Sequence, residues 1–301
     1  MTNDIKMLIN AVQQGNMERI RQTAVYVLKN DNTQKDLRYC ENMIDRLESQ
    51  HMLTALPKEL SDCLVFEENV NQTFIPERYY LSDLNRALLN DIISVDKVSE
   101  KLTEKRIRYV NSTLLHGASG TGKTTFGRCV AHSLGIPYVY ISFANLISSY
   151  LGKTGNRIKS IFNYIKGQRC VFMIDELDSI GVTRGSSNEA GEVSRIAISL
   201  MQALDSLGND VVLLGATNRI DIIDPAILRR FTRKVEMKEL TQEESKEFAR
   251  KYLADCGYPY DNAEIIAAVT RTNKPSEIER EINAQIVRWE TQNKKQLGES
   301  W

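Results

Sequence analysis

A glycine-rich segment near the middle of the sequence has the residue types and spacing of a phosphate-binding loop. It reads Gly117-Ala-Ser-Gly-Thr-Gly-Lys-Thr124 and fits GxxxxGK[ST] at every fixed position. In such a loop, backbone N–H groups surround the phosphates, the lysine reaches the β and γ oxygens, and the final hydroxyl binds Mg²⁺. The segment lies between an expected strand ending at Leu115 and an expected helix over 124–134, whose N-terminus favours an anion. We therefore expect a nucleoside triphosphate and Mg²⁺ to bind here.

Two adjacent carboxylates follow a second apolar strand. The run that begins at Cys170 ends in Asp175, and Glu176 comes next. Nucleotide hydrolases use this arrangement to hold the water shell of Mg²⁺ and to polarise the attacking water. On its own, such a pair is as often a strand that meets a solvated turn, but a phosphate loop about fifty residues upstream favours catalysis. We assign Asp175 to the metal, through water, and Glu176 to the base.

The two motifs together predict the residues that contact the nucleotide. Thr124 is expected to ligate Mg²⁺ because of its register in the loop, and its neighbour Thr125 is treated as helix surface rather than as a metal ligand. The full set of predicted nucleotide contacts is Gly117, Ala118, Ser119, Gly120, Thr121, Gly122, Lys123, Thr124, Thr125 and Asp175.

A third apolar strand begins at Val211 and is followed by Asn218. In a parallel sheet this amide would emerge beside the other strand ends, so it is a candidate for positioning the attacking water. In isolation, Asn218 is more typical of a turn residue that ends a strand. The segment 224–233 that follows, Asp-Pro-Ala-Ile-Leu-Arg-Arg-Phe-Thr-Arg, decides between the two, because residues 117–233 then resemble an AAA ATPase, the AAA+ subgroup with a second region of homology.

This resemblance covers roughly residues 79–301 and implies a ring, usually of six subunits, that binds ATP. In the family, arginines of one subunit reach the γ-phosphate held by its neighbour. Aligned with the family, the two arginine fingers fall on Arg230 and Arg233, with Arg229 as the near-miss candidate. Without the resemblance, three clustered arginines are typical of a solvated surface.

The same resemblance singles out Tyr150, Leu151 and Gly152 as a pore loop that grips an extended polypeptide. The aromatic ring supplies apolar contact that tolerates different sequences, and the glycine lets the loop stand upright. The alternative for these three residues is a helix end with its C-cap glycine. Residues 184–192 are expected to form a second pore loop.

Some positions depart from the family's usual pattern. Ala118 and Ser119 stand where two prolines are common, and Lys153 stands where a pore-loop glutamate is frequent. Ser276 lies near the place where many relatives have a sensor arginine in the lid. Each departure leaves hydrolysis plausible.

The alternation of apolar strands with helices predicts an α/β fold. The resemblance to AAA ATPases implies that this fold is a P-loop NTPase of the ASCE class, with a parallel five-stranded sheet core and a C-terminal helical lid. Continuous apolar strands are typical of a parallel sheet covered by helices on both faces. One long helix is expected over 81–106. The strands are expected within 112–117, 136–142, 169–175, 210–218 and 233–237.

Helical spacing also predicts a three-helix module at the N-terminus, with its third helix around Leu37–Leu47. Prolines and the loss of periodicity indicate a linker or an irregular wrapping segment after it. In the lid, Thr241-x-x-Glu244 and Ser276-x-x-Glu279 fit capping boxes. The expected organisation is an adaptor module over 1–52, a linker over 53–78, the large α/β ATPase subdomain over 79–240 and the lid over 241–301.

Composition restricts the function classes. The 39 Lys and Arg residues balance 39 Asp and Glu residues, so the chain has no overall basic field of the kind that dominates nucleic-acid affinity. No signal peptide and no long apolar run are visible, so we expect a cytoplasmic protein with no membrane partner. The five cysteines are scattered without a CxxC spacing, which is typical of reduced thiols, and there is no HExxH motif.

The primary hypothesis is an ATP-driven homo-oligomeric ring, expected to be a hexamer, that unfolds, translocates or remodels a protein substrate through a central pore. A small helical module followed by a single AAA unit resembles two groups: the microtubule-severing and membrane-remodelling AAA enzymes, and the bacterial AAA ATPases that accompany a separate, often subtilisin-like, protease. The compact chain and short adaptor favour the bacterial group. The first alternative is a nucleic-acid-linked ATPase, such as a helicase loader or transposition helper, which the zero net charge disfavours. The second is an ATP-dependent switch or assembly scaffold with negligible turnover.

Overall fold

The structure is a computed structural model. By its internal contacts the chain divides into two compact units, Met1–Thr54 and Ala55–Trp301. The sheet, the lid and the candidate site all belong to the second unit. The described residues are 3–13, 17–29, 57, 60, 62–67, 70–149, 154–182, 187–260, 266–267 and 271–296.

The first unit begins with two helices, α1 (Asn3–Gln13) and α2 (Met17–Lys29), which pack against each other. Both lie where the helical spacing predicts them. Ile9 and Val12 of α1 stay 50% and 56% exposed. The third helix that we expect around Leu37–Leu47 lies outside the described residues.

The second unit is built on one six-stranded sheet with the order β1-β3-β4-β5-β2-β6. Strands β3, β4, β5, β2 and β6 are parallel to one another, which confirms the predicted five-stranded parallel core. The sixth strand, β1, is antiparallel to β3 and forms one edge. The strands are β1 (Val65–Glu67), β2 (Asn111–His116), β3 (Tyr138–Ser142), β4 (Cys170–Asp175), β5 (Val211–Thr217) and β6 (Arg233–Glu236).

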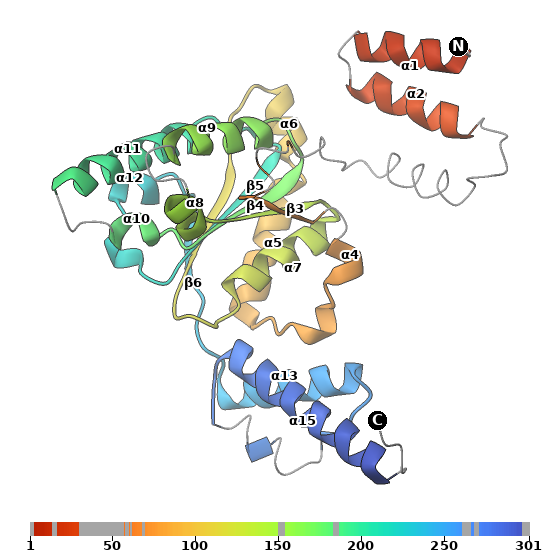
Figure 1. The fold of residues 1–301 in the computed structure, drawn as a ribbon, viewed down its shortest axis with the longest axis vertical. Coiled ribbons are helices and arrows are strands. Elements are labelled where there is room, and N and C mark those ends of the chain that lie inside the picture. The colour runs from red at the N-terminus through yellow and green to blue at the C-terminus, as the bar shows by residue number, and fades with distance from the viewer. Residues whose placement is uncertain are drawn as a thin grey trace. The chain divides into compact units, whose positions relative to one another are not determined.

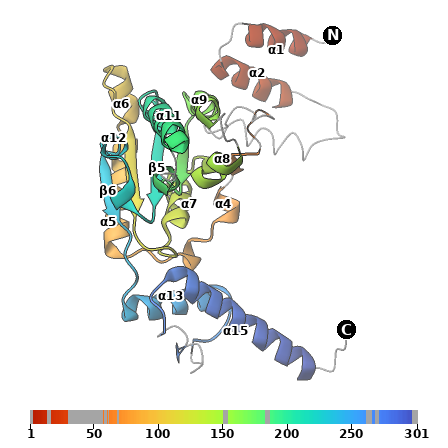
Figure 2. The ribbon, with the colours of Figure 1, turned by 60° about the vertical axis from the view of Figure 1, so that its left-hand side comes forward.

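Helices cover both faces of this sheet (Figure 1), which explains why the central strands β4 and β5 are buried along almost their whole length. Helices α9 and α11 lie side by side over one face, and α5 and α7 cover the other. The view in Figure 2 shows the same pairing of α9 with α11. The described helices between β1 and the lid, apart from α4 and η2, are α5 (Asp83–Asp96), α6 (Ser99–Glu104), α7 (Lys123–Leu134), α8 (Phe143–Ser149), α9 (Thr154–Ile165), α10 (Ser179–Val182), α11 (Ser187–Leu204), η3 (Ile220–Ile222) and α12 (Pro225–Leu228).

The single helix predicted over 81–106 is two helices, α5 and α6. The last residue of α5, Asp96, is buried and forms an ion pair with Arg169, with 2.6 Å between Oδ2 and Nη2. Because Arg169 directly precedes β4, this pair ties the end of α5 to the sheet. The chain then starts again as α6 at Ser99.

The segment expected to be a linker, 53–78, contributes structure to the second unit. It supplies the edge strand β1, the short helix α4 (Val70–Thr73) and the 3₁₀ helix η2 (Pro76–Arg78). Val70 and Phe74 are buried in the main hydrophobic cluster beside α7. The scattered prolines and polar residues of this segment leave no apolar periodicity, so its sequence does not predict these contacts.

The C-terminal part forms a separate small helical core, as the predicted lid requires. Helices α13 (Gln242–Asp255) and α15 (Pro275–Gln296) enclose Phe248, Leu253 and Ile278. The capping box of α13 is confirmed: Glu244 N–H donates to Thr241 Oγ1, and Thr241 N–H donates to the Glu244 carboxylate. The second predicted box is wrong, because α15 begins at Pro275 and so contains Ser276 rather than starting after it. Among the described residues, no helix combines the length and apolar character needed to cross a bilayer.

The centre of the sheet is packed closely around a glycine of β5. A Cβ atom added at Gly215 would lie 2.7 Å from Phe231 Cζ and 2.9 Å from Leu177 Cδ1. Phe231 is 1% exposed and follows α12, so Gly215 leaves room for the segment that carries the candidate arginine fingers to pack on the sheet.

Replacing Gly215 by Ala should therefore overpack this contact and lower the free energy of unfolding by about 1–3 kcal/mol. Gly208→Ala is the matched control, since its added Cβ would lie 3.5 Å from Asp210 Oδ2, an ordinary contact. Urea unfolding followed by circular dichroism measures both variants. Equal midpoints for the two variants would contradict the packing argument.

Candidate nucleotide-binding site

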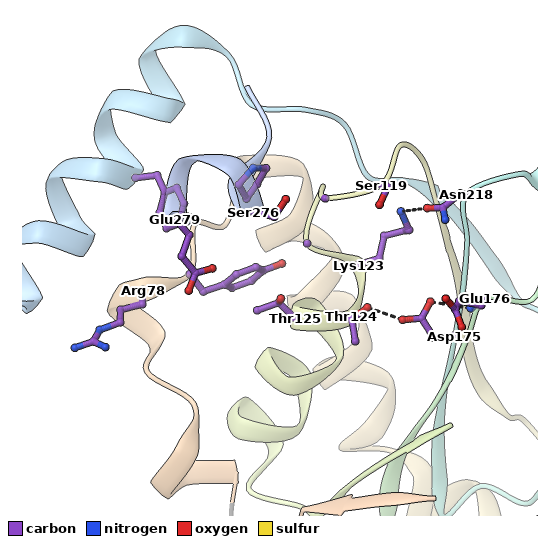
Figure 3. Close-up of a pocket in the computed structure, with 15 residues that line it drawn as sticks. Arg78, Ser119, Lys123, Thr124, Thr125, Asp175, Glu176, Asn218, Ser276 and Glu279 are labelled. Carbon is purple, nitrogen blue, oxygen red and sulfur yellow. Dashed lines mark hydrogen bonds between the residues drawn. The ribbon is translucent and has the colours of Figure 1, made fainter. Parts of the chain in front are cut away.

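A cavity of about 300 Å³ lies where the phosphate loop, the ends of β4 and β5 and the lid come together. Lys123, Thr124, Asp175, Glu176 and Asn218 all line it. Figure 3 shows these side chains gathered at one end of the cavity, while Arg78, Ser276 and Glu279 lie at the other end. The cavity therefore has a highly polar end at the sheet and a second end formed with the lid.

The loop from Gly117 to Gly122 folds as the motif predicts, between β2 and α7. Gly117 and Gly122 have φ angles of 141° and 89°, a region that side-chain-bearing residues rarely adopt. A Cβ at Gly117 would also lie 2.4 Å from the carbonyl oxygen of Met237. Thr121 Oγ1 donates to the carbonyl of Ala118 at 3.0 Å and braces the loop.

The Lys123 ammonium is held inside this loop by three acceptors. Nζ donates to the carbonyls of Gly117 and Ala118 at 2.9 and 2.7 Å, and to Asn218 Oδ1 at 2.9 Å. Burial lowers the pKa of Lys123, while the carboxylates of Asp175 and Asp178 act in the opposite direction. The structure thus brings the predicted lysine and the predicted strand-end amide into direct contact.

The predicted metal ligands are also adjacent. Thr124 Oγ1 donates to Asp175 Oδ2 at 2.5 Å, across 51 residues of sequence. A hydroxyl and a carboxylate oxygen are the hard ligands that Mg²⁺ prefers, and Mg²⁺ usually completes its shell with phosphate and water oxygens. The donor set at this point of the cavity therefore fits Mg²⁺.

Glu176 follows β4 in a strained backbone conformation. Its φ of 59° lies in the left-handed region, and in the described part of the chain only one other non-glycine residue, Arg106, has a positive φ. Its carboxylate accepts a hydrogen bond from the Ser142 hydroxyl. Ser142 ends β3 and is paired with Asp175 across the sheet, so the two strands together orient the glutamate.

The sequence analysis did not single out two polar neighbours of these groups, Ser142 and Asp178. Asp178 Oδ1 accepts hydrogen bonds from Thr217 Oγ1 at 2.8 Å and from Asn218 N–H at 3.2 Å, so it holds the end of β5. A polar residue that ends an apolar strand was a usable signal for Ser142. Asp178 has no comparable signal, because it lies in the turn after β4 and its partners, Thr217 and Asn218, lie 39 and 40 residues later in the sequence.

The end of the cavity nearer the lid is bounded by the strap, which we define as residues 75–81. Arg78 Nε donates to Asp255 Oδ2 of α13 at 2.7 Å, and Tyr80 OH donates to Glu247 Oε2 at 3.2 Å. From α15, the Ser276 N–H donates to the carbonyl of Gly120 at 3.3 Å. The lid is therefore bonded both to the strap and to the phosphate loop.

The predicted arginine fingers do not line this cavity. Arg230 forms two hydrogen bonds with the Asp205 carboxylate, at 3.0 and 2.7 Å, and these lower the pKa of Asp205. Arg233 is bonded to Asp91 Oδ2 at 2.5 Å and to Asn111 Oδ1 at 2.9 Å. Both guanidinium groups are therefore paired within the subunit, and the near-miss candidate, Arg229, is exposed.

The pore-loop predictions cannot be placed on the structure. Tyr150, Leu151 and Gly152 lie outside the described residues, between α8 and α9. Of the second predicted loop, 184–186 is also outside them, and α11 begins at Ser187.

Comparison with known proteins supplies the family. Residues 113–239 match the AAA family, the ATPase family associated with various cellular activities. A peroxisomal ATPase, pex6 of Schizosaccharomyces pombe, is 34% identical over 169 residues, which are 54% of this chain and 18% of the relative. A proteasome-activating nucleotidase of Methanosphaerula palustris is 37% identical over 148 residues, 47% of this chain and 36% of the relative.

An ATP-dependent zinc metalloprotease, FtsH of Lachnoclostridium phytofermentans, is 33% identical over 159 residues, 50% of this chain and 28% of the relative. The chain thus spans 36% or less of the length of these three relatives. The matched segment, 113–239, contains the phosphate loop, Asp175, Glu176 and Asn218. The chain thus carries an AAA domain of the AAA+ superfamily over residues 113–239, while Arg78, Tyr79, Ser276 and Glu279 line the cavity from outside that segment.

Proposed function

We propose that this chain hydrolyses ATP at the cavity, with Mg²⁺. One observation carries the proposal: an ammonium, a hydroxyl, two carboxylates and an amide from three separate parts of the sequence line one cavity. The family match supports ATP as the nucleotide. Thr124 and Asp175 would hold Mg²⁺, Asp175 through water, and the ion would neutralise charge on the phosphate oxygens.

The residues have separable roles in this proposal. The Lys123 ammonium exchanges its loop carbonyls for the β and γ oxygens. Glu176 accepts a proton from the attacking water, and the Asn218 amide holds that water in line. Ser142 donates a hydrogen bond to the Glu176 carboxylate, and that bond must be given up or shared when Glu176 accepts a proton from the attacking water.

Glu176→Gln should keep the shape of the site and remove the base. ATP binding should persist, while hydrolysis should fall by about 10²–10⁴-fold. Steady-state phosphate release and binding of a fluorescent ATP analogue measure the two properties. Glu104→Gln is the matched control, because Glu104 is exposed on α6 and does not line the cavity. Hydrolysis by Glu176→Gln at the parent rate would remove Glu176 from the role of base.

We further propose that the active form is a homo-oligomeric ring, a hexamer, in which Arg230 and Arg233 act on the ATP of the adjacent subunit. Their position supports action in trans, since neither lines the cavity of its own subunit. Arg230 would have to exchange the Asp205 carboxylate for a phosphate oxygen of comparable charge. Such an exchange is feasible because the Asp205 side chain is 54% exposed.

Arg230→Ala should spare ATP binding and lower hydrolysis by up to about 10³–10⁵-fold, the range for a missing arginine finger. Mixing it with Lys123→Ala protein should restore activity, because some interfaces then combine an intact loop with an intact finger. Phosphate release is measured over a range of mixing ratios, under conditions in which subunits exchange.

Asp205→Asn serves as the control for this experiment, because it breaks the same ion pair and keeps the guanidinium. It should retain most of the activity. A loss equal to that of Arg230→Ala, or mixtures no more active than the sum of their parts, would count against a finger acting in trans.

We also propose that the ring works on protein substrates, pulling or remodelling them through its pore. The support comes from the relatives, whose names include a nucleotidase that activates the proteasome and an ATP-dependent metalloprotease. A separate protease, of the subtilisin-like type, is the proposed partner. The zero net charge gives no support to a nucleic-acid substrate.

Tyr150→Ala tests the protein-remodelling proposal, because the predicted pore residue would touch the polypeptide and not the nucleotide. Basal ATPase should stay within a few-fold of the parent, an effect of about 1 kcal/mol, while stimulation by an unfolded protein substrate should vanish. Tyr150→Phe should restore stimulation if apolar contact is what matters. Unfolding of a fluorescent reporter protein is the readout, and normal unfolding by Tyr150→Ala would exclude this pore loop.

A further inference from the structure

One polar group at the cavity remains without a partner. The Tyr79 hydroxyl oxygen is buried and has no hydrogen-bond partner in the described part of the chain. Tyr79 also lines the cavity, although nothing in the sequence analysis singles it out. A buried hydroxyl that forms no hydrogen bond costs free energy, about 1–3 kcal/mol, so such a group in a binding cavity calls for a ligand.

The position of Tyr79 is fixed by its two neighbours in the strap, Arg78 and Tyr80. Its neighbour Arg78 is bonded to Asp255, and its guanidinium lies 5.4 Å from the centre of the Tyr252 ring. On the other side, Tyr80 is bonded to Glu247. Alternate residues of the strap therefore anchor on the lid helix α13, and Tyr79 between them faces the ATPase core. A hydroxyl held this way loses little conformational freedom when it binds.

The Tyr79 ring itself packs against the core. It meets the Phe74 ring edge to face at 5.9 Å between centroids. A Cβ added at Gly122 would lie 3.4 Å from Tyr79 Cε2 and 3.9 Å from its hydroxyl. The hydroxyl therefore lies against the last glycine of the phosphate loop, at the junction between the loop and the strap.

This junction is where the nucleoside part of a nucleotide would emerge. The groups suited to the β and γ phosphates and to Mg²⁺ are Lys123, Thr124 and Asp175, all at the far end of the cavity (Figure 3). A nucleotide whose phosphates lie there must place its sugar and base toward the strap and the lid. Both carry hydrogen-bonding groups that match a hydroxyl, which donates one hydrogen bond and accepts two.

We propose that Tyr79 is a specificity-determining residue whose hydroxyl forms a hydrogen bond with the nucleoside part, the sugar or the base, of the bound nucleotide. The inference rests on the proposed ATP site and names a contact outside the segment that matches the family, 113–239. Burial raises the pKa of Tyr79 well above its usual range, so the hydroxyl keeps its proton and is neutral at neutral pH.

The test compares Tyr79→Phe with the parent, because this change removes the hydroxyl and keeps the ring. Calorimetry measures the Kd for ATP and for inorganic tripolyphosphate, which has no nucleoside. Tyr260→Phe is the matched control: its hydroxyl is also buried without a partner among the described residues, but it packs beside the lid core and does not line the cavity.

Tyr79→Phe should weaken ATP binding roughly 3- to 10-fold, the effect of one neutral hydrogen bond, and leave tripolyphosphate binding unchanged. Tyr260→Phe should change neither. The melting temperature without nucleotide should not fall in Tyr79→Phe, while the stabilisation by ATP should shrink. A purely structural role would instead lower the melting temperature without nucleotide.

Two results would overturn the inference: unchanged ATP affinity in Tyr79→Phe, or an equal loss of affinity for ATP and tripolyphosphate, which would move the contact to the phosphates. Either result is distinct from failure of the proposed function, in which the parent protein itself would bind no ATP. Binding of 2′-deoxy-ATP and GTP by both proteins then separates sugar from base. If Tyr79 contacts the 2′-hydroxyl, Tyr79→Phe should not weaken binding of 2′-deoxy-ATP; if Tyr79 contacts the adenine base, the variant should not weaken binding of GTP.

Discussion

The carboxyl ends of β2, β4 and β5 lie at one edge of the sheet, and every candidate group of the site depends on that register. In the order β4-β5-β2, Gly215 is paired with Ile174 and Thr217 with His116. A slip of one residue would turn every side chain of a strand to the opposite face. The register therefore decides whether Asn218 meets Lys123 and whether Asp178 can hold the end of β5. Burial on both faces makes such a slip costly, because β5 is buried along its whole length.

The lid depends on the same edge through different contacts. Ser276 is bonded to the carbonyl of Gly120 within the phosphate loop, and the strap is bonded to α13 through Arg78 and Tyr80. These are polar contacts near the surface, and the hydrophobic core of the lid is separate from that of the sheet. The two cores are separate, but Tyr80 of the strap packs against the lid core beside Phe248, so a change in the angle of the lid must either carry the strap along or break this contact.

The sequence predicts the features that are local. The phosphate loop, the five parallel strands and the capping box at Thr241 are patterns of neighbouring residues, and the structure bears them out. Contacts between distant segments were not predicted, because they join residues that share no periodicity. Examples are the contacts of Ser142 with Glu176, of Asp178 with the end of β5, and of the strap with the lid. The edge strand β1 escaped for a related reason, since three residues are too few to show alternation. The predicted helix divides at Asp96, which is paired with Arg169, a residue 73 positions later in the sequence, and no local pattern reveals such a contact.

The Lys123 ammonium has a consequence for how the protein captures its ligand. Its three N–H donors are all bonded to neutral acceptors of the protein, and the residue is only 7% exposed. These neutral acceptors leave the positive charge of the ammonium in place, so it still attracts an approaching anion, and the association rate should fall as the ionic strength rises. Phosphate binding is an exchange of hydrogen-bond partners, in which the enthalpy gained at the phosphate is offset by the bonds released. Such a site adds discrimination at close range to the electrostatic attraction, because only a ligand that replaces all three acceptors recovers the hydrogen bonds released.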